Sequence, residues 1–124
     1  MISWIYNFLL SVRCASNGIL YAVKTERNIR VHLYIFALML LVCLLLRIAK
    51  MELLIILGMS ALMISLELVN TAIERMADIV SPEFNAQIGL VKDIMAGAVL
   101  VTSIFAVIIW LVILFEPLKH LFQK

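Results

Sequence analysis

Hydrophobic residues form three long runs that carry no formal charge. The runs span Val31 to Leu46, Leu53 to Leu66 and Ile94 to Phe115. Only the third reaches the roughly 20 residues that a helix needs to cross the hydrocarbon core of a bilayer. The first two must include polar flanking residues, and Arg47 and Lys50 can place their charges at the interface while their stems follow the apolar zone. The pattern predicts transmembrane helices at about 29–49, 52–78 and 92–115.

A weaker periodic pattern precedes the first run. Ile2, Ile5, Leu9 and Val12 recur at spacings of three and four. This spacing favours an amphipathic helix that lies in the membrane interface over residues 1–28, with a partly disordered tail as the alternative. No basic leader comes before this stretch, so a cleavable signal is not expected. The whole chain, 1–124, is predicted to be one all-α integral membrane domain.

Composition and charge agree with a membrane location. Hydrophobic residues make up 65% of the chain and the mean hydropathy is +1.15, whereas soluble domains contain roughly 45–50% apolar residues. The net charge of +2 gives no reason to expect nucleic-acid binding. More Lys and Arg residues lie before the first run and between the second and third than on the other side. This distribution favours a cytoplasmic N-terminus.

Three short helices leave much of each helix surface facing outward, and the middle helix carries ionisable groups that lipid does not tolerate. Oligomerisation solves this problem by covering those groups with other copies of the chain. Small residues such as Gly58, Ser60, Ala61 and Gly97 would allow helices to approach closely.

Polar residues appear where the second run ends, in the stretch E-L-V-N-T-A-I-E-R-M-A-D. On a helix, Glu67, Asn70, Glu74 and Asp78 fall within an arc of about 80°. Glu74 and Asp78 could simply be solvated where the helix leaves the membrane. Glu67 and Asn70 lie among apolar residues, and an ionisable group in such a helix indicates a functional site.

Two further clusters surround the hydrophobic runs. Gly89, Lys92 and Asp93 precede the third run, where a lysine beside free helix N-terminal amides can hold phosphate. The alternative is that Lys92 anchors the helix at the interface and Asp93 begins it. Glu26 and Arg30, before the first run, are spaced to form a surface ion pair.

These groups together suggest a reaction class. Oxygen ligands without His or Cys clusters suit Mg²⁺, which takes one or two carboxylates and completes its shell with water and phosphates. A lysine for phosphate and one more carboxylate as base would serve phosphoryl transfer. The four glycines form neither a Walker A loop nor a protein-kinase glycine loop.

The motif E-L-V-N-T-A-I-E, with Asp78 four residues later and G-x-x-K-D from Gly89 to Asp93, resembles the signature of the small prokaryotic diacylglycerol kinase family. The resemblance covers about Ser11 to Trp110. It implies a homotrimer of three-span subunits in the bacterial cell membrane, with the active site on the cytoplasmic face. It also implies transfer of the γ-phosphoryl group of ATP, with Mg²⁺, to a lipid hydroxyl.

The resemblance also implies roles for individual residues. Glu67 would be the catalytic base, and Glu26 and Glu74 would bind Mg²⁺. The residues that contact or position the nucleotide would be these two metal ligands with Asn70, Asp78, Gly89, Lys92 and Asp93.

The stretch N-G-I-x-x-A-x-x-T-E-R-N-x-R-x-H, from Asn17 to His32, resembles the Gram-positive branch, whose preferred lipid is undecaprenol. Undecaprenol is therefore the predicted acceptor and diacylglycerol the alternative. A different class of function is a non-enzymatic oligomeric channel subunit whose carboxylates line a pore. A pore requires polar groups through the bilayer, and Leu53 to Leu66 offers only Ser60 and Ser65.

Overall fold

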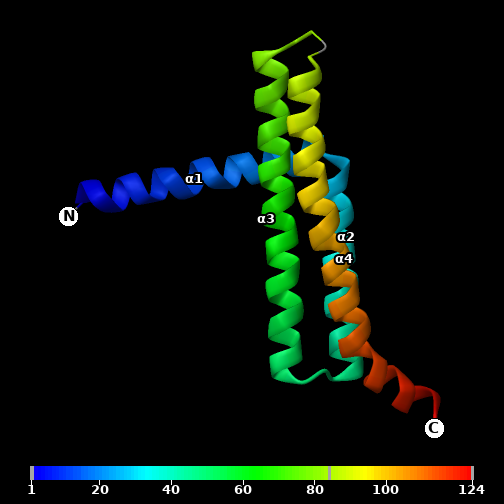
Figure 1. The fold of residues 1–124 in the computed structure, drawn as a ribbon. Coiled ribbons are helices and arrows are strands. Elements are labelled where there is room, and N and C mark those ends of the chain that lie inside the picture. Colours follow the sequence, from blue (N-terminus) through cyan, green and yellow to red (C-terminus); the bar gives the residue numbers. More distant parts are fainter. Residues whose placement is uncertain (1, 84, 124) are drawn as a thin grey trace.

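A computed structural model describes residues 2–83 and 85–123. The chain forms helices α1 (Ile2–Thr25), α2 (Arg27–Leu46), α3 (Lys50–Val80) and α4 (Ala86–Phe122). Helices α2, α3 and α4 run side by side with alternating direction, while α1 projects across the bundle to one side (Figure 1). In the most apolar 18-residue segments of α2, α3 and α4, the mean hydropathy is 2.4, 2.1 and 2.9. The prediction of an all-α chain with three helices long and apolar enough to cross a membrane is confirmed.

A single residue, Glu26, forms the elbow between α1 and α2. Its backbone is extended, with φ −98° and ψ 124°. The side chain of Arg30 turns back and donates hydrogen bonds to the carbonyl oxygens of Val23 and Lys24, at 3.0 and 2.9 Å. These carbonyls belong to the last turn of α1 and have no partner within the helix. Arg30 therefore caps α1 and holds it against the start of α2.

The turn between α2 and α3 is short, as predicted, and comprises residues 47–49. Arg47 adopts a left-handed conformation with φ 53°. The amide of Ile48 donates to the carbonyl of Cys43 at 3.1 Å, which is the helix-ending pattern that usually places glycine at the left-handed position. On the far side of the turn, Glu52 accepts a hydrogen bond from the Ala49 amide at 3.3 Å and caps α3.

The bundle has a small apolar core near this turn. Met39, Cys43 and Ile56 are buried there, and Trp110 and Leu114 of α4 pack against them. In the most apolar 18-residue segment of α4, only 6% of the residues are buried within one chain. Most of this helix therefore presents apolar side chains to lipid or to another subunit.

The predicted helices 52–78 and 92–115 leave a connection of about 79–91, and the observed connection is shorter. Only residues 81–85 lie between α3 and α4. Pro82 ends α3, because the residue before a proline is disfavoured in the helical conformation. The side chain of Asn85 caps the first turn of α4 by accepting from the amides of Gln87 and Ile88 at 2.9 and 3.4 Å. Gly89, Lys92 and Asp93 are consequently helical residues.

The cap on α1 predicts a difference between two neighbouring arginines. Replacing Arg30 with Met should raise hydrogen exchange of the α1 backbone about tenfold or more. The reason is that hydrogen bonds from a charged donor contribute about 1.5–3 kcal/mol. The measurement is amide hydrogen exchange in nanodiscs. Arg27→Met is the matched control, since Arg27 is exposed at the start of the same helix, and equal exchange in both variants would contradict the capping role.

Candidate active site

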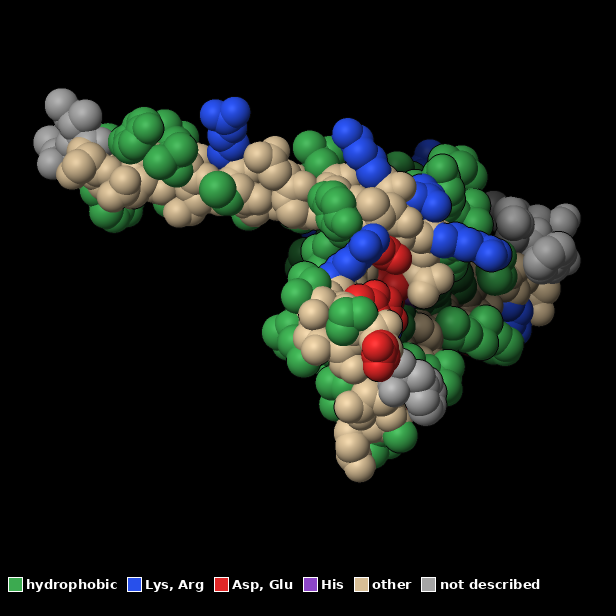
Figure 2. All heavy atoms as spheres, turned by 90° about the horizontal axis from the view of Figure 1, so that it is seen from above, with side chains coloured by type: hydrophobic (Ala, Val, Ile, Leu, Met, Phe, Trp, Pro, Cys, Tyr) green, Lys and Arg blue, Asp and Glu red, His purple; other side chains and the backbone are tan. Residues whose placement is uncertain are grey.

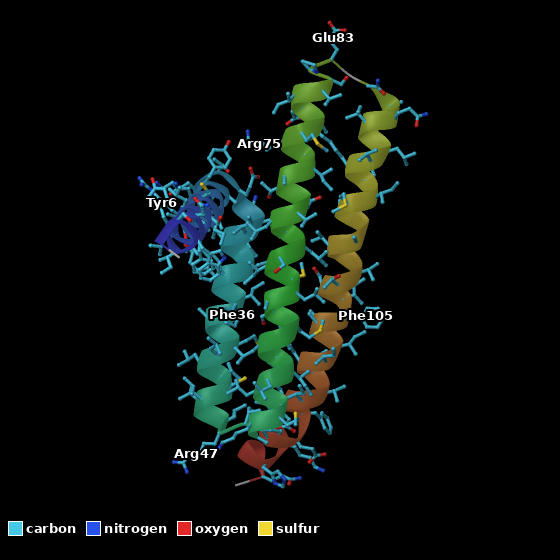
Figure 3. All side chains as sticks on the ribbon, turned by 90° about the vertical axis from the view of Figure 1, so that its left-hand side faces the viewer. Tyr6, Phe36, Arg47, Arg75, Glu83 and Phe105 are labelled. Atoms are coloured by element: carbon cyan, nitrogen blue, oxygen red, sulfur yellow. The ribbon has the colours of Figure 1, made fainter. Side chains whose placement is uncertain are left out.

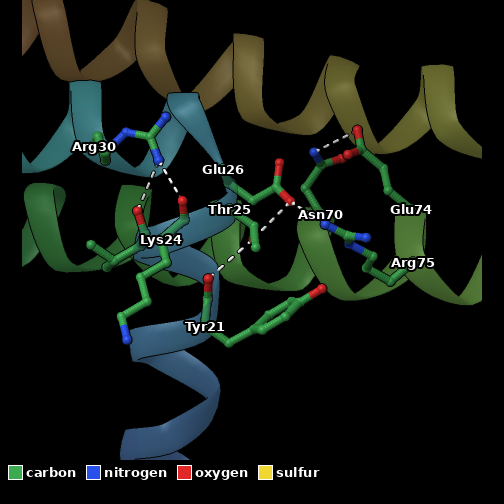
Figure 4. Close-up of polar contacts among 9 residues, drawn as sticks. Tyr21, Lys24, Thr25, Glu26, Arg30, Asn70, Glu74 and Arg75 are labelled. Atoms are coloured by element: carbon green, nitrogen blue, oxygen red, sulfur yellow. Dashed lines mark hydrogen bonds and ion pairs between the residues drawn. The ribbon is translucent and has the colours of Figure 1, made fainter.

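The polar face of α3 is buried at the level of Glu67. Glu67 is 2% exposed and Asn70 is 5% exposed. The side-chain amide of Asn70 donates a hydrogen bond to Glu74 Oε1 at 3.0 Å (Figure 4). Because α3 is helical from Lys50 to Val80, Glu67 lies about one turn before Asn70 on this face. The stripe expected from the sequence therefore exists as one helix surface.

Two oxygen atoms of this face lack a hydrogen-bond partner. They are Glu67 Oε2 and Asn70 Oδ1, which are buried and accept no hydrogen bond from the described part of the chain. Buried polar groups are nearly always paired in folded proteins, because leaving them unpaired costs about 1–3 kcal/mol and more for a charged group. These oxygens can therefore accept a hydrogen bond or a cation from a bound ligand.

Glu26 belongs to a separate polar cluster at the elbow. Its Oε1 accepts from Arg75 Nη2 and from Thr25 Oγ1, each at 3.2 Å. The guanidinium of Arg75 lies over the ring of Tyr21, 5.4 Å from the ring centroid. Figures 3 and 4 show Arg75 on the side of α3 that faces the end of α1. The ion pair suggested between Glu26 and Arg30 is not formed, because Arg30 binds the carbonyls at the end of α1.

Lys92 of α4 pairs with Asp78 of α3 through Lys92 Nζ and Asp78 Oδ1. Both residues line a cavity of about 290 Å³ between the ends of the two helices. Gly89 also lines it, and a Cβ at this position would meet nothing within 4 Å. The cavity therefore has an anchored ammonium group and an open stretch of backbone.

The helix N-terminus beside this cavity is already capped. The Gln87 and Ile88 amides donate to the Asn85 side chain, and the Gly89 amide donates to the Asn85 carbonyl at 2.9 Å. The expectation of free amides next to Lys92 is therefore wrong, and a phosphate at this place would depend on the lysine. Asp93 is exposed and, within residues 2–83 and 85–123, its side chain makes neither a hydrogen bond nor an ion pair.

Seen along the bundle, acidic side chains gather in the middle of this end, and Lys and Arg side chains border them (Figure 2). Across the described ranges, no three His, Cys, Asp or Glu side chains come together as a complete metal site. The available groups are nevertheless carboxylate and amide oxygens, the kind that Mg²⁺ prefers. The unpaired Glu67 and Asn70 oxygens fit an added cation in chemistry, although residues 2–83 and 85–123 do not supply a full set of ligands.

An apolar groove of about 360 Å³ lies between α1 and α3. Gly18 and Ile19 of α1 and Leu68 and Ala72 of α3 line it, and Tyr21 and Arg75 belong to its polar border. The sequence patterns did not predict that Arg75, Tyr21 and Thr25 lie beside the candidate site. The sequence offers one hint of their position: Thr25 is next to Glu26, and Arg75 is next to Glu74.

The chain is similar to characterised proteins along most of its length. It is 35% identical to a diacylglycerol kinase of Synechocystis over 93% of this chain and 66% of that protein. It is 34% identical to the undecaprenol kinase of Bacillus subtilis over 90% of each chain. Residues 13–114 match the family described as prokaryotic diacylglycerol kinase. The chain therefore belongs to this family of membrane lipid kinases.

Proposed function

We propose that this protein transfers the γ-phosphoryl group of ATP to the hydroxyl of undecaprenol. The observation that most directly supports this proposal is the buried Glu67 carboxylate, whose Oε2 has no hydrogen-bond partner among the described residues. A lipid hydroxyl that enters the site can donate the missing hydrogen bond and then lose its proton to Glu67. The groove between α1 and α3 is apolar and suits a long hydrocarbon tail.

The choice of lipid rests on the relatives. The relative named undecaprenol kinase aligns over 90% of both chains. The relative named diacylglycerol kinase has a similar identity, but this chain spans only 66% of its length. Diacylglycerol is therefore the second candidate acceptor.

In the proposed phosphoryl transfer, each polar residue of the site has a defined role. Glu67 accepts the hydroxyl proton while the lipid oxygen forms a bond to the γ-phosphorus and the bond from that phosphorus to the bridging oxygen breaks, releasing ADP. Lys92, held by Asp78, would bind phosphate oxygens in the cavity between α3 and α4. Asn70 would help to position the nucleotide, Gly89 would leave room for it beside Lys92 because no side chain stands there, and Asp93 would join them from the surface of α4.

Glu26 and Glu74 would hold Mg²⁺, and the bound ion would supply positive charge that stabilises the negative charge of the nucleotide phosphates during transfer. Glu74 is already oriented by the hydrogen bond from Asn70. The Glu26 carboxylate is oriented by Arg75 and Thr25. Their oxygen chemistry supports Mg²⁺ as the cofactor.

We also propose a homotrimer with its active sites on the cytoplasmic face. Two features support assembly: small residues such as Gly58, Ser60 and Gly97, which allow membrane helices to approach closely, and the finding that within the described ranges His, Cys, Asp and Glu side chains do not converge as a complete set of metal ligands. Helix α1 would lie in the interface, since Trp4, Tyr6 and Phe8 are exposed on it and the Trp4 and Phe8 rings stack 5.9 Å apart. The excess of Lys and Arg near α1 and the α3–α4 turn supports the cytoplasmic orientation.

A direct assay tests the acceptor. Purified protein in mixed micelles with radiolabelled ATP and Mg²⁺ should phosphorylate undecaprenol with a higher kcat/KM than diacylglycerol. The apolar groove can accept either tail, so both lipids must be tested under the same conditions. A preference for diacylglycerol would reverse the proposed acceptor, and failure to phosphorylate either lipid would refute the proposed function.

Replacing Glu67 with Gln should reduce turnover about 10²–10⁴-fold, the usual contribution of a general base. Nucleotide binding and thermal stability should be retained, because the amide keeps the shape of the side chain and removes a buried charge. The measurements are steady-state kinetics, ATP-analogue binding and a melting curve. Glu116→Gln at the opposite end of α4 is the control for loss of one carboxylate, and near-normal turnover of Glu67→Gln would exclude the assigned role.

Replacing Lys92 with Met should lower kcat/KM for ATP about 10–100-fold, since a charged hydrogen bond contributes about 1.5–3 kcal/mol. Stability should change little, because its ion pair with the exposed Asp78 is worth only about 0–1 kcal/mol. Lys92→Arg should also be impaired, because a planar fork replaces a compact charge. Lys119→Met is the control. Loss of stability with unchanged ATP kinetics would instead identify Lys92 as an interfacial anchor.

A further inference from the structure

The two oxygen atoms of Glu26 have different surroundings. Oε1 accepts a hydrogen bond from Arg75 Nη2 at 3.2 Å, and Thr25 Oγ1 lies at the same distance, although its single proton is shared with the Tyr21 carbonyl oxygen at 3.1 Å (Figure 4). No residue in the described ranges donates a hydrogen bond to Oε2. The carboxylate is thus fixed through one oxygen, while the other stays available to a ligand.

The local helix does not explain this orientation. Glu26 occupies the N-cap position of α2, where a carboxylate oxygen commonly accepts from the first free amides of the helix. Its side chain makes no such cap bond. Contacts with Arg75, which is distant in sequence, and with Thr25 therefore determine where the carboxylate points.

Arg75 is itself held in place. Its guanidinium lies 5.4 Å from the centroid of the Tyr21 ring, a distance at which cation and ring attract each other. The Glu26 side chain is 25% exposed and that of Arg75 is 49% exposed. An isolated pair with this exposure contributes about 0–1 kcal/mol to stability, so stabilising the fold is a weak explanation for the arrangement.

We propose that Arg75 is a positioning residue for the metal site, and this inference rests on the proposed function of Glu26. Together with Thr25, Arg75 holds Glu26 Oε1 so that Oε2 faces a divalent cation bound with ATP. Groups that orient a metal-binding carboxylate commonly affect metal affinity 10–100-fold when they are removed. Arg75 thereby links α3 to the elbow that carries Glu26.

Metal binding can be measured without lipid and without turnover. Purified protein in nanodiscs is titrated with Mn²⁺ in the presence of a non-hydrolysable ATP analogue, and bound Mn²⁺ is followed by electron paramagnetic resonance. Arg75→Met should weaken Mn²⁺ binding about 10–100-fold. Arg75→Lys should lose less, because it keeps a cation that can donate to Oε1. In kinetics, Arg75→Met should require more Mg²⁺ and recover kcat when Mg²⁺ is saturating.

A matched control and a double variant sharpen the test. Lys24→Met removes a cation from the same elbow, and the Lys24 side chain is exposed, so its Mn²⁺ affinity should equal that of the wild type. Glu26→Gln should weaken Mn²⁺ binding by itself. Arg75→Met should add little in the Glu26→Gln background, because both changes act on the same carboxylate.

Three results would overturn the positioning role. The first is unchanged or tighter Mn²⁺ binding in Arg75→Met, which would mean that Arg75 is structural or competes with the cation. The second is full additivity with Glu26→Gln, which would place the action of Arg75 on another group, such as a phosphate. The third is absence of Mn²⁺ binding in the wild type, which would refute the proposed function as well. A lower melting temperature with normal Mn²⁺ affinity belongs to the first result.

Discussion

A carboxylate buried in an apolar membrane bundle is the constraint on which the rest of the structure depends. Glu67 is 2% exposed, and its Oε2 has no partner within the described chain. Ionised groups in such surroundings are unfavourable by several kcal/mol unless a hydrogen bond or an opposite charge compensates them. The neighbouring Asn70 does not compensate it, since Asn70 donates to Glu74 and its own Oδ1 is also unpaired. In the proposed reaction, the lipid hydroxyl would supply the hydrogen bond that Glu67 Oε2 does not receive from the described residues.

At the elbow between α1 and α2, a few residues provide partners both for the last carbonyl groups of α1 and for the Glu26 carboxylate. Arg30 satisfies the last carbonyls of α1, which leaves Glu26 without the neighbour that its spacing suggests. Glu26 is then free to pair with Arg75 across the helices. A stretch of six residues, from Thr25 to Arg30, thus fixes the direction of α1 and also orients a carboxylate toward the polar end of the bundle. Structural and chemical tasks are divided between the two charged residues.

Periodicity and charge were sufficient to predict the helices and the polar face of α3, because both are local properties of the sequence. The α3–α4 connection was predicted too long, since the turn-forming residues Ser81, Pro82, Asn85 and Gly89 together suggested a longer loop. The Asn85 cap instead allows the helix to begin at Ala86 and to continue through the glycine. Contacts between residues that are distant in the sequence could not be predicted from local patterns. Nothing in the spacing of Glu26 and Arg75, 49 residues apart, indicates that they meet, whereas the i,i+4 bond between Asn70 and Glu74 follows from the helix itself.

The separation of the carboxylates and the exposure of the helices are two consequences of one architecture. Within the described ranges, oxygen ligands are present on α3 and at the elbow, but three acidic or histidine side chains do not converge. In the same chain, nearly all residues of the most apolar 18-residue segment of α4 are not buried. If assembly covers the apolar surface, it also brings a second set of polar groups toward the first. Van der Waals packing and hydrogen bonds between helices would then provide the free energy of association, because lipid tails are as apolar as the surface of α4, and the polar face of α3 would be more stable in such an assembly than in one chain.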